Sequence, residues 1–237
     1  IKQEGLCLIS GKKIIAELGV YSDDQKNINS NSPANFKPLF EILHPGLSPV
    51  TGAESVVFSQ NLFAQLDVLG TDFNLVVVPV PPYEVWQGSD SSKIESELQV
   101  LVPLQDPSNL GSLVRSCEAF GVKQIVLLKE SANPYLPKSI KTSGGSVFRC
   151  QFLQGPSIQE INDSVVALDL KGKDIRLFDW SKHRQFLVGE EGKGIPSHLS
   201  NVVRVRIPMS GRLESLNAVV AASIALWDFK NKSGGTE

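Results

Sequence analysis

Methionine, cysteine and histidine are scarce in this sequence: its 237 residues include one Met, three Cys and three His. Cys7, Cys117 and Cys150 form no CxxC pair, and no histidine lies near them at ligand spacing. The sequence therefore gives no sign of a disulfide framework or a structural zinc site, and we expect three free thiols in a reducing environment. The histidines form no HExxH pattern, so no metal is expected.

Long apolar runs are also missing. No stretch is long enough to span a bilayer or has the layout of a signal peptide, and 41% hydrophobic with 20% charged residues is typical of a globular protein. We expect a water-soluble protein with one large domain or two ordinary ones. Because the chain begins at Ile1, removal of a targeting segment stays open, and with it the choice between the cytoplasm and an organelle.

Positive charge is scarce in the first part of the chain. Residues 1–97 carry six Lys and Arg against twelve Asp and Glu, a net charge of −6. Residues 98–237 carry seventeen against thirteen, a net charge of +4. A polyanionic partner is therefore expected to meet the second part.

The first part has the pattern of a small α/β unit. Residues 6–18 predict an apolar segment and a short helix, for which Ser10 is a possible cap. Residues 36–43 and 74–80 predict strands, and the polar residues 23–35 predict a loop. Residues 58–69 predict a helix whose apolar face consists of Phe58, Leu62, Leu66 and Leu69. The segment between residues 80 and 97 is rich in Pro and Ser, so we predict a domain boundary there. The predicted domains are residues 1–90 and 98–237.

The second part alternates short apolar strands with helical or loop segments. The predicted strands are residues 98–104, 125–128, 165–170, 186–188 and 203–207. This alternation predicts a parallel sheet covered on both faces, in which ligands bind at the carboxyl ends of the strands.

The first loop at such an end, residues 105–109, leads into a helix. Its buried stripe is predicted to be Leu110, Leu113, Val114, Cys117 and Phe120. Arg115 points away from that stripe, which is also what a solvated surface arginine would do. Residues 141–146, which include Ser143 and Gly144, are either another ligand-facing turn or an ordinary connection.

The second loop, residues 189–194, contains three glycines in six positions, which let a backbone approach a ligand closely. It is neither a P-loop nor a GxGxxG fingerprint, and a β-turn with an acidic tip is the alternative. The third loop follows Pro208 and leads into a helix from residue 216. Its expected apolar residues are Leu216, Val219, Val220, Ile224 and Trp227, beside a face of small residues. Ser215 and Asn217 lie where a helix needs caps.

These loops resemble the three ordered motifs of the SpoU (TrmH-type) branch of the SPOUT RNA methyltransferases. The motifs are Asn109-x-Gly111 with Arg115, Gly189-x-Glu191-Gly192-x-Gly194, and Ile207-Pro208-Met209-x-Gly211 followed by Ser215-Leu216-Asn217. The resemblance covers residues 98–229, and residues 5–80 more loosely resemble a small ribosomal-protein-like α/β domain. Ala218-Val219 departs from the Val-Ser of many members.

The resemblance implies a ribose 2′-O-methyltransferase that uses S-adenosylmethionine. It further implies an α/β domain with a mostly parallel sheet and a deep trefoil knot, working as a homodimer on RNA without a metal or a membrane. The implied catalytic positions are Asn109, Arg115, Glu191, Ser215 and Asn217. The implied cofactor-binding positions are Ser143, Gly144, Gly189, Glu191, Gly192, Ile207, Met209, Ser215, Leu216 and Asn217.

Several points stay open at this level. The choice between rRNA and tRNA is not decided, although the extra N-terminal domain favours rRNA; that acidic domain would have to hold RNA near Lys12 and Lys13. A guanidinium stays protonated, so we expect Arg115 to clamp a phosphate rather than to act as the general base. The residue that takes the proton from the ribose hydroxyl is therefore not identified. Helix capping by Asn109 or Ser215 and loop pinning by Glu191 are structural alternatives. A catalytically silent RNA-binding module is the alternative function, while a nucleotide-dependent oxidoreductase lacks its phosphate-binding fingerprint.

Overall fold

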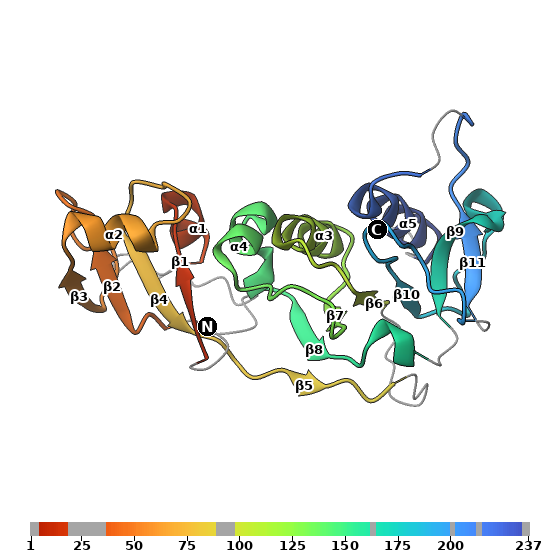
Figure 1. The fold of residues 1–237 in the computed structure, drawn as a ribbon, viewed down its shortest axis with the longest axis horizontal. Coiled ribbons are helices and arrows are strands. Elements are labelled where there is room, and N and C mark those ends of the chain that lie inside the picture. Colours follow the sequence, from red (N-terminus) through yellow and green to blue (C-terminus); the bar gives the residue numbers. More distant parts are fainter. Residues whose placement is uncertain are drawn as a thin grey trace.

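A four-stranded sheet lies in the first part of the chain, at the left of Figure 1. The computed structural model describes residues 5–18, 37–88, 98–161, 165–199, 202–211 and 215–233. The spatial order of the strands is β1 (Leu6–Ile9), β4 (Leu75–Pro79), β2 (Phe40–Leu43) and β3 (Glu54–Val57). Helices α1 (Lys12–Glu17) and α2 (Gln60–Leu66) belong to the same unit. The loop predicted for residues 23–35 lies outside the described residues.

Three details of this unit differ from the sequence-based expectation, and the first is strand β3, which was not predicted. Helix α1 begins after Gly11, whose φ of 94° lies in the left-handed region, and Ser10 does not cap it. Helix α2 buries Phe63 and leaves Leu62 41% exposed. The reason is its shortness: a helix capped by Ser59 and ending at Leu66 can turn only one face to the sheet, and Phe63 fills it.

A seven-stranded sheet organises the second part. Its spatial order is β11 (Val203–Arg206), β9 (Val166–Asp174), β10 (Gln185–Leu187), β6 (Gln99–Val102), β7 (Gln124–Leu127), β8 (Gln151–Gln154) and β5 (Glu84–Val85). All of its pairings are parallel, as predicted. The sequence did not predict β5 and β8. Strand β5 joins this sheet although it precedes residue 90, and the division at that residue stays a prediction.

Side chains of this sheet alternate between two cores. Val100 and Val102 face the core that contains α3 (Pro107–Ala119), α4 (Pro137–Ser143) and α5 (Ala218–Ser233), all on the upper side of the sheet in Figure 1. Leu101 faces the other core, where loop and turn residues such as Trp86 and Leu199 cover the sheet. Both faces are therefore buried, which explains why the strands are apolar without alternation.

The two sheets share one core. Cys7 and Ile9 of β1 and Ile14 of α1 belong to the same apolar cluster as the residues of α3 and α4. Cys7, Cys117 and Cys150 are all buried and free. Burial raises the pKa of Cys7 and Cys150 to about 12, so both thiols stay protonated at neutral pH.

Helix α5 buries Val219, Leu226 and Phe229 together with small residues, and it leaves two residues of the predicted apolar stripe outside. Ala222 and Ala225 are each 1% exposed, whereas Val220 is 50% and Trp227 56% exposed. Small side chains let α5 approach α3 closely, and the hydroxyl of Ser223 donates a 2.8 Å hydrogen bond to Ser116 of α3. The larger side chains on the other face are consequently left outside.

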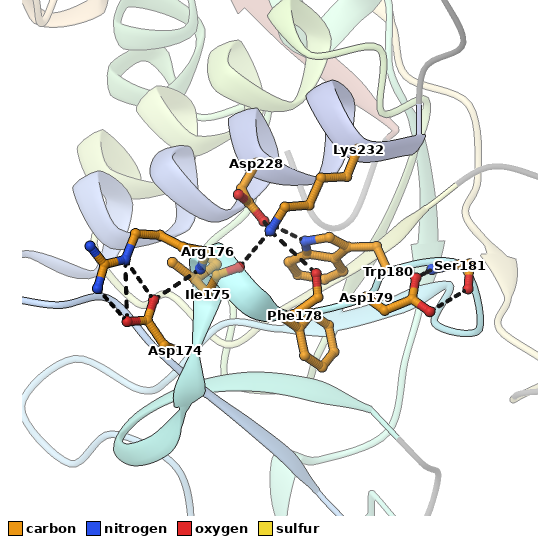
Figure 2. Close-up of polar contacts among 9 residues, drawn as sticks. All are labelled: Asp174, Ile175, Arg176, Phe178, Asp179, Trp180, Ser181, Asp228 and Lys232. Atoms are coloured by element: carbon orange, nitrogen blue, oxygen red, sulfur yellow. Dashed lines mark hydrogen bonds and ion pairs between the residues drawn. The ribbon is translucent and has the colours of Figure 1, made fainter.

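The far end of α5 is anchored by a buried carboxylate (Figure 2). Asp228 accepts a 2.7 Å hydrogen bond from Trp180 Nε1 and pairs with Lys232 at 2.9 Å. The Lys232 ammonium also donates to the carbonyl oxygens of Ile175 and Phe178, at 2.6 and 3.2 Å. These contacts fix α5 to residues 175–180 and so determine where the beginning of the helix lies.

Candidate functional site

The carboxyl ends of β6, β9, β10 and β11 lie at one edge of the sheet because these strands are parallel. The three loops identified from the sequence therefore converge. They surround a cavity of about 550 Å³, which we call the first cavity. Its lining includes Asn109, Asp169, Gly189, Glu190, Glu191, Gly192, Lys193, Ile207, Met209, Ser215, Leu216, Asn217, Ala218, Ala221 and Ala222.

The first loop is fixed by Asp106. Its carboxylate accepts hydrogen bonds from the backbone N–H groups of Ser108, at 2.8 Å, and Asn109, at 3.0 Å. Those bonds, that of Asn109 first, hold the pKa of Asp106 below its usual value. Asp106 is thus the cap of α3, and Asn109 is not. The side chain of Asn109 is consequently free to point toward the second loop.

Glu191 joins the first two loops. Asn109 Nδ2 donates a 2.6 Å hydrogen bond to Glu191 Oε1, and the backbone N–H of Asp106 donates to Oε2 at 3.3 Å. The carboxylate of Glu191 therefore holds the second loop against the start of α3. This is the structural role that the sequence offered for Glu191 as an alternative to a catalytic one. The loop itself closes as a tight turn, with reciprocal 2.9 Å backbone hydrogen bonds between Glu190 and Gly194.

Glycine is required at two places in this turn. Gly192 and Gly194 have φ values of 76° and 71°, which other residues rarely adopt. The backbone of this turn therefore lines the cavity at Gly192 and Gly194, where no side chain is present.

The third loop brings Ser215, Leu216 and Asn217 to the cavity. Asn217 Oδ1 accepts hydrogen bonds from the N–H groups of Val219, at 2.9 Å, and Val220, at 3.3 Å. Asn217 thus caps α5, the structural alternative expected for it, and within the described part of the chain its amide nitrogen has no hydrogen-bond partner. Residues 212–214 of this loop lie outside the described part of the chain.

The first cavity is negatively charged. Among the described residues that line it, Asp169, Glu190 and Glu191 stand against the cation Lys193, a net charge of −2 before the pairing of Asp169 with Arg204 is counted. The pKa of Asp169 is lowered by a hydrogen bond from the Lys171 backbone and by the Arg204 guanidinium, so this carboxylate is ionised at neutral pH. The sequence analysis missed Asp169, although its position near the end of a predicted strand was a usable signal. Such a cavity favours a cationic ligand.

Three of the predicted site residues lie elsewhere. Arg115, Ser143 and Gly144 line a separate cavity between α1, α3 and α4, which we call the second cavity. The Arg115 guanidinium lies against Gly144, where an added Cβ would be 3.8 Å from its Cζ atom. The structure therefore gathers Asn109, Glu191, Ser215 and Asn217 but does not bring Arg115 to them within one chain.

Two further searches concern only the described residues. They contain no group of three or more His, Cys, Asp or Glu side chains placed to hold a metal ion. They also contain no helix that is long and apolar enough to cross a membrane.

The fold and the cavity define a class: a parallel α/β protein with a ligand site at the carboxyl edge of its sheet. The model of the SpoU rRNA Methylase family matches residues 98–227, more than half of the sequence. The chain belongs to this family, which confirms the resemblance found in its motifs.

Individual relatives match over shorter lengths. The "Ribosomal RNA small subunit methyltransferase G 2" of Syntrophobacter fumaroxidans is 36% identical over 178 residues, 74% of this chain and 35% of that protein. The "23S rRNA (uridine(2479)-2'-O)-methyltransferase" of Streptomyces viridochromogenes is 34% identical over 141 residues, 52% of this chain and 48% of that protein. The chain thus spans less than half of the length of either relative.

A solved structure shares the fold over almost the entire chain. It is the SpoU methyltransferase AviRb from Streptomyces viridochromogenes in complex with the cofactor AdoMet. Its TM-score is 0.76 at 23% sequence identity, covering 96% of this chain and 90% of that chain. This likeness confirms the α/β fold with its mostly parallel sheet. The trefoil knot and the ribosomal-protein-like character of the first unit stay predictions.

Proposed function

We propose that this chain is an S-adenosylmethionine-dependent methyltransferase that modifies a ribose 2′-hydroxyl of RNA, with rRNA favoured over tRNA. The observation that carries the proposal is the first cavity, in which three separated motifs of the matched family region meet in one negatively charged site. The names of the two relatives, both of which mention ribosomal RNA, favour rRNA.

The residues of the first cavity fit this cofactor. Three carboxylates suit its positive charge, and the apolar side chains of Ile207, Met209 and Leu216 offer a surface for its adenine ring. The small residues Ala221 and Ala222 leave room at the base of the cavity. When bound, S-adenosylmethionine supplies an activated methyl group on a sulfonium.

The tasks left to the chain are positioning and charge stabilisation. The free amide nitrogen of Asn217 faces the same cavity as Asn109, and both are assigned to orienting the ribose. Glu191 holds the second loop in register with α3 through its two hydrogen bonds. Arg115 is assigned to clamping a phosphate and stabilising the developing alkoxide, since a guanidinium stays protonated and presents a planar fork.

A homodimer reconciles the position of Arg115 with that assignment. Val220 and Trp227 form an exposed apolar face on α5, and α5 packs directly beside α3, the helix that carries Arg115. Pairing of two copies through this face would remove apolar surface from water. In the proposed dimer, Arg115 of one copy completes the first cavity of the other.

Methyl transfer to defined RNA tests the proposed activity. Unmodified 16S and 23S rRNA transcripts and a tRNA mixture are incubated with methyl-labelled S-adenosylmethionine, and nuclease protection then maps modified 2′ positions. We expect label in rRNA at a 2′-oxygen. RNA binding without label in any RNA would instead support the catalytically silent module.

Complementation tests the shared site. Arg115→Ala and Asn217→Ala are expected to be inactive separately, because each removes a different contribution to every site. After the two variants are mixed and allowed to exchange subunits, heterodimers should regain one intact site, about a quarter of wild-type activity for random pairing. No recovery, with subunit exchange verified by mass spectrometry, would show that Arg115 acts within its own chain or not at all.

A further inference from the structure

The second cavity lies where the two sheets meet. It has a volume of about 580 Å³ and is bordered by α1 on one side and by α3 and α4 on the other. Figure 1 shows α1 next to α4 at this junction, and β1 contacts α4. Of the residues that line this cavity, the proposed methyl transfer uses only Arg115, and the other cations there have no role in it.

Cationic side chains dominate its lining. Lys12, Lys13, Arg115, Lys141 and Arg149 stand against the carboxylates Glu17 and Glu118, which gives a net charge of +3. The whole chain has a net charge of −2, so this concentration of positive charge runs against its composition. The cavity therefore has the opposite sign from the first one.

Most of these cations are not neutralised by the protein. Arg149 is paired with Glu118, to which its Nη2 donates at 3.0 Å, and Lys13 lies 3.7 Å from Glu17 on an exposed face. Among the described residues, the side chains of Lys12, Arg115 and Lys141 form no hydrogen bond or ion pair. Their charge is available to a ligand.

Two glycines form the turn beside Arg115, and Gly144 lines the cavity. Gly144 and Gly145 have φ values of 59° and 84°, both in the left-handed region. The Arg115 guanidinium lies against Gly144, and a Cβ on Gly145 would be 3.6 Å from Arg149 Nη1 and 3.5 Å from Ile14 of α1. The bare backbone of this turn thus lets two guanidinium groups and α1 converge on one place.

We propose that the second cavity binds the phosphodiester backbone of the RNA substrate. The inference rests on the proposed function for the identity of the polyanion. Arginine and lysine from two structural units provide several contacts for a chain of phosphates, and such contacts position RNA without reading its bases. The first part of the chain is acidic elsewhere, so α1 is where it meets the RNA.

Removal of two lysines that the catalytic proposal does not use tests this inference. The variant combines Lys12→Ala with Lys141→Ala, and its control combines Lys37→Ala with Lys182→Ala, two exposed lysines that line neither cavity. Affinity for a fluorescent single-stranded RNA of about 30 nucleotides is measured by anisotropy between about 50 and about 300 mM KCl. Affinity for S-adenosylmethionine is measured on each protein as a check of folding.

We expect the Lys12/Lys141 variant to bind the RNA about tenfold more weakly at 0.1 M salt, with the log–log salt slope reduced by about 1.4. The control should stay within about twofold of the wild type, and all three should bind S-adenosylmethionine equally. Wild-type RNA affinity and slope in the Lys12/Lys141 variant would overturn the inference. Displacement of the RNA by inorganic phosphate at an equal concentration of phosphate groups would also overturn it, since the site would then be one for the free ion.

The two proposals fail separately. A wild-type protein that binds RNA through these lysines but transfers no methyl group refutes the proposed function and leaves the RNA site standing. A protein that methylates RNA with the same Michaelis constant in the wild type and the Lys12/Lys141 variant refutes the RNA site alone.

Discussion

The first cavity carries a net charge of −2 and the second one of +3, yet helix α3 borders both. Asn109 in its first turn faces the first cavity, and Arg115 faces the second. Six residues separate them, which is about 9 Å along the axis and about 240° around it. One helix therefore presents an amide to a negatively charged cavity and a guanidinium to a positively charged one. The difference teaches that closeness in a sequence motif does not mean a shared site within one chain, and in the proposed dimer Arg115 reaches the first cavity of the other copy.

The largest effect is expected from Arg115→Lys, which keeps the charge and removes the planar fork. Turnover should fall by about 100-fold or more, because clamping by two parallel N–H groups is lost, while affinity for S-adenosylmethionine is unchanged. Single-turnover methyl transfer and calorimetric binding measure the two quantities. Arg176→Lys, at an exposed arginine paired with Asp174, is the matched control and should be silent. Near-normal turnover in Arg115→Lys would contradict the assigned role.

The close contact of α4 with α3, the helix that borders both cavities, is tested by Gly111→Ala. A Cβ at this position would overlap Thr142 Oγ1 and the carbonyl oxygen of Ser139, because α3 and α4 are in close contact there. We expect a loss of about 2 to 3 kcal/mol in the free energy of unfolding, measured by urea denaturation. Gly52→Ala, which has nothing within 4 Å of its added Cβ, should change it by less than about 0.5 kcal/mol. Equal stabilities would show that the helices can separate without cost.

Glu191→Gln tests the difference in charge between the first and the second cavity. The change removes one carboxylate from the first cavity and weakens the 2.6 Å hydrogen bond from Asn109. Affinity for S-adenosylmethionine should fall about tenfold, and RNA affinity should not change. Isothermal calorimetry and anisotropy report the two ligands separately. The exposed Glu84→Gln is the control, and an equal loss of RNA affinity in Glu191→Gln would show that the cavities are not independent.

The smallest effect concerns Glu118 in the second cavity. Its hydrogen bond from Arg149 lowers its pKa below the usual 4.5. The carboxylate is therefore expected to stabilise the fold above about pH 4.5 and to lose that contribution as pH falls through the lower folded pKa. Wild type and Glu118→Gln should differ by less than about 1 kcal/mol at pH 7, because the pair is about one third exposed. That difference should shrink in urea denaturation near pH 3.5, and a difference that grows with acid would contradict it.

Much of the fold follows from local pattern. The apolar segments of the second part predicted five of the strands, and the buried stripe of α3 was predicted correctly at Leu110, Leu113, Val114 and Cys117. Strands β5 and β8 were missed because β5 has two exposed residues and β8 has only Phe152 and Leu153 between two glutamines, so neither gives a clear apolar pattern. The three loops were found because parallel strands place their carboxyl ends together, and glycine and capping residues mark those ends.

The sequence by itself determined most of the strands, where the chain turns, and that three motifs meet at one sheet edge, since these depend on short-range backbone preferences and hydrophobic pattern. Only the tertiary structure decided that Ala222 and Ala225 face inward while Val220 and Trp227 face out, because that choice depends on how closely α3 approaches. It also decided that Arg115 joins Lys12 across the junction of the two sheets. Charges more than 100 residues apart in sequence meet only after both units have packed, and no local pattern encodes their distance.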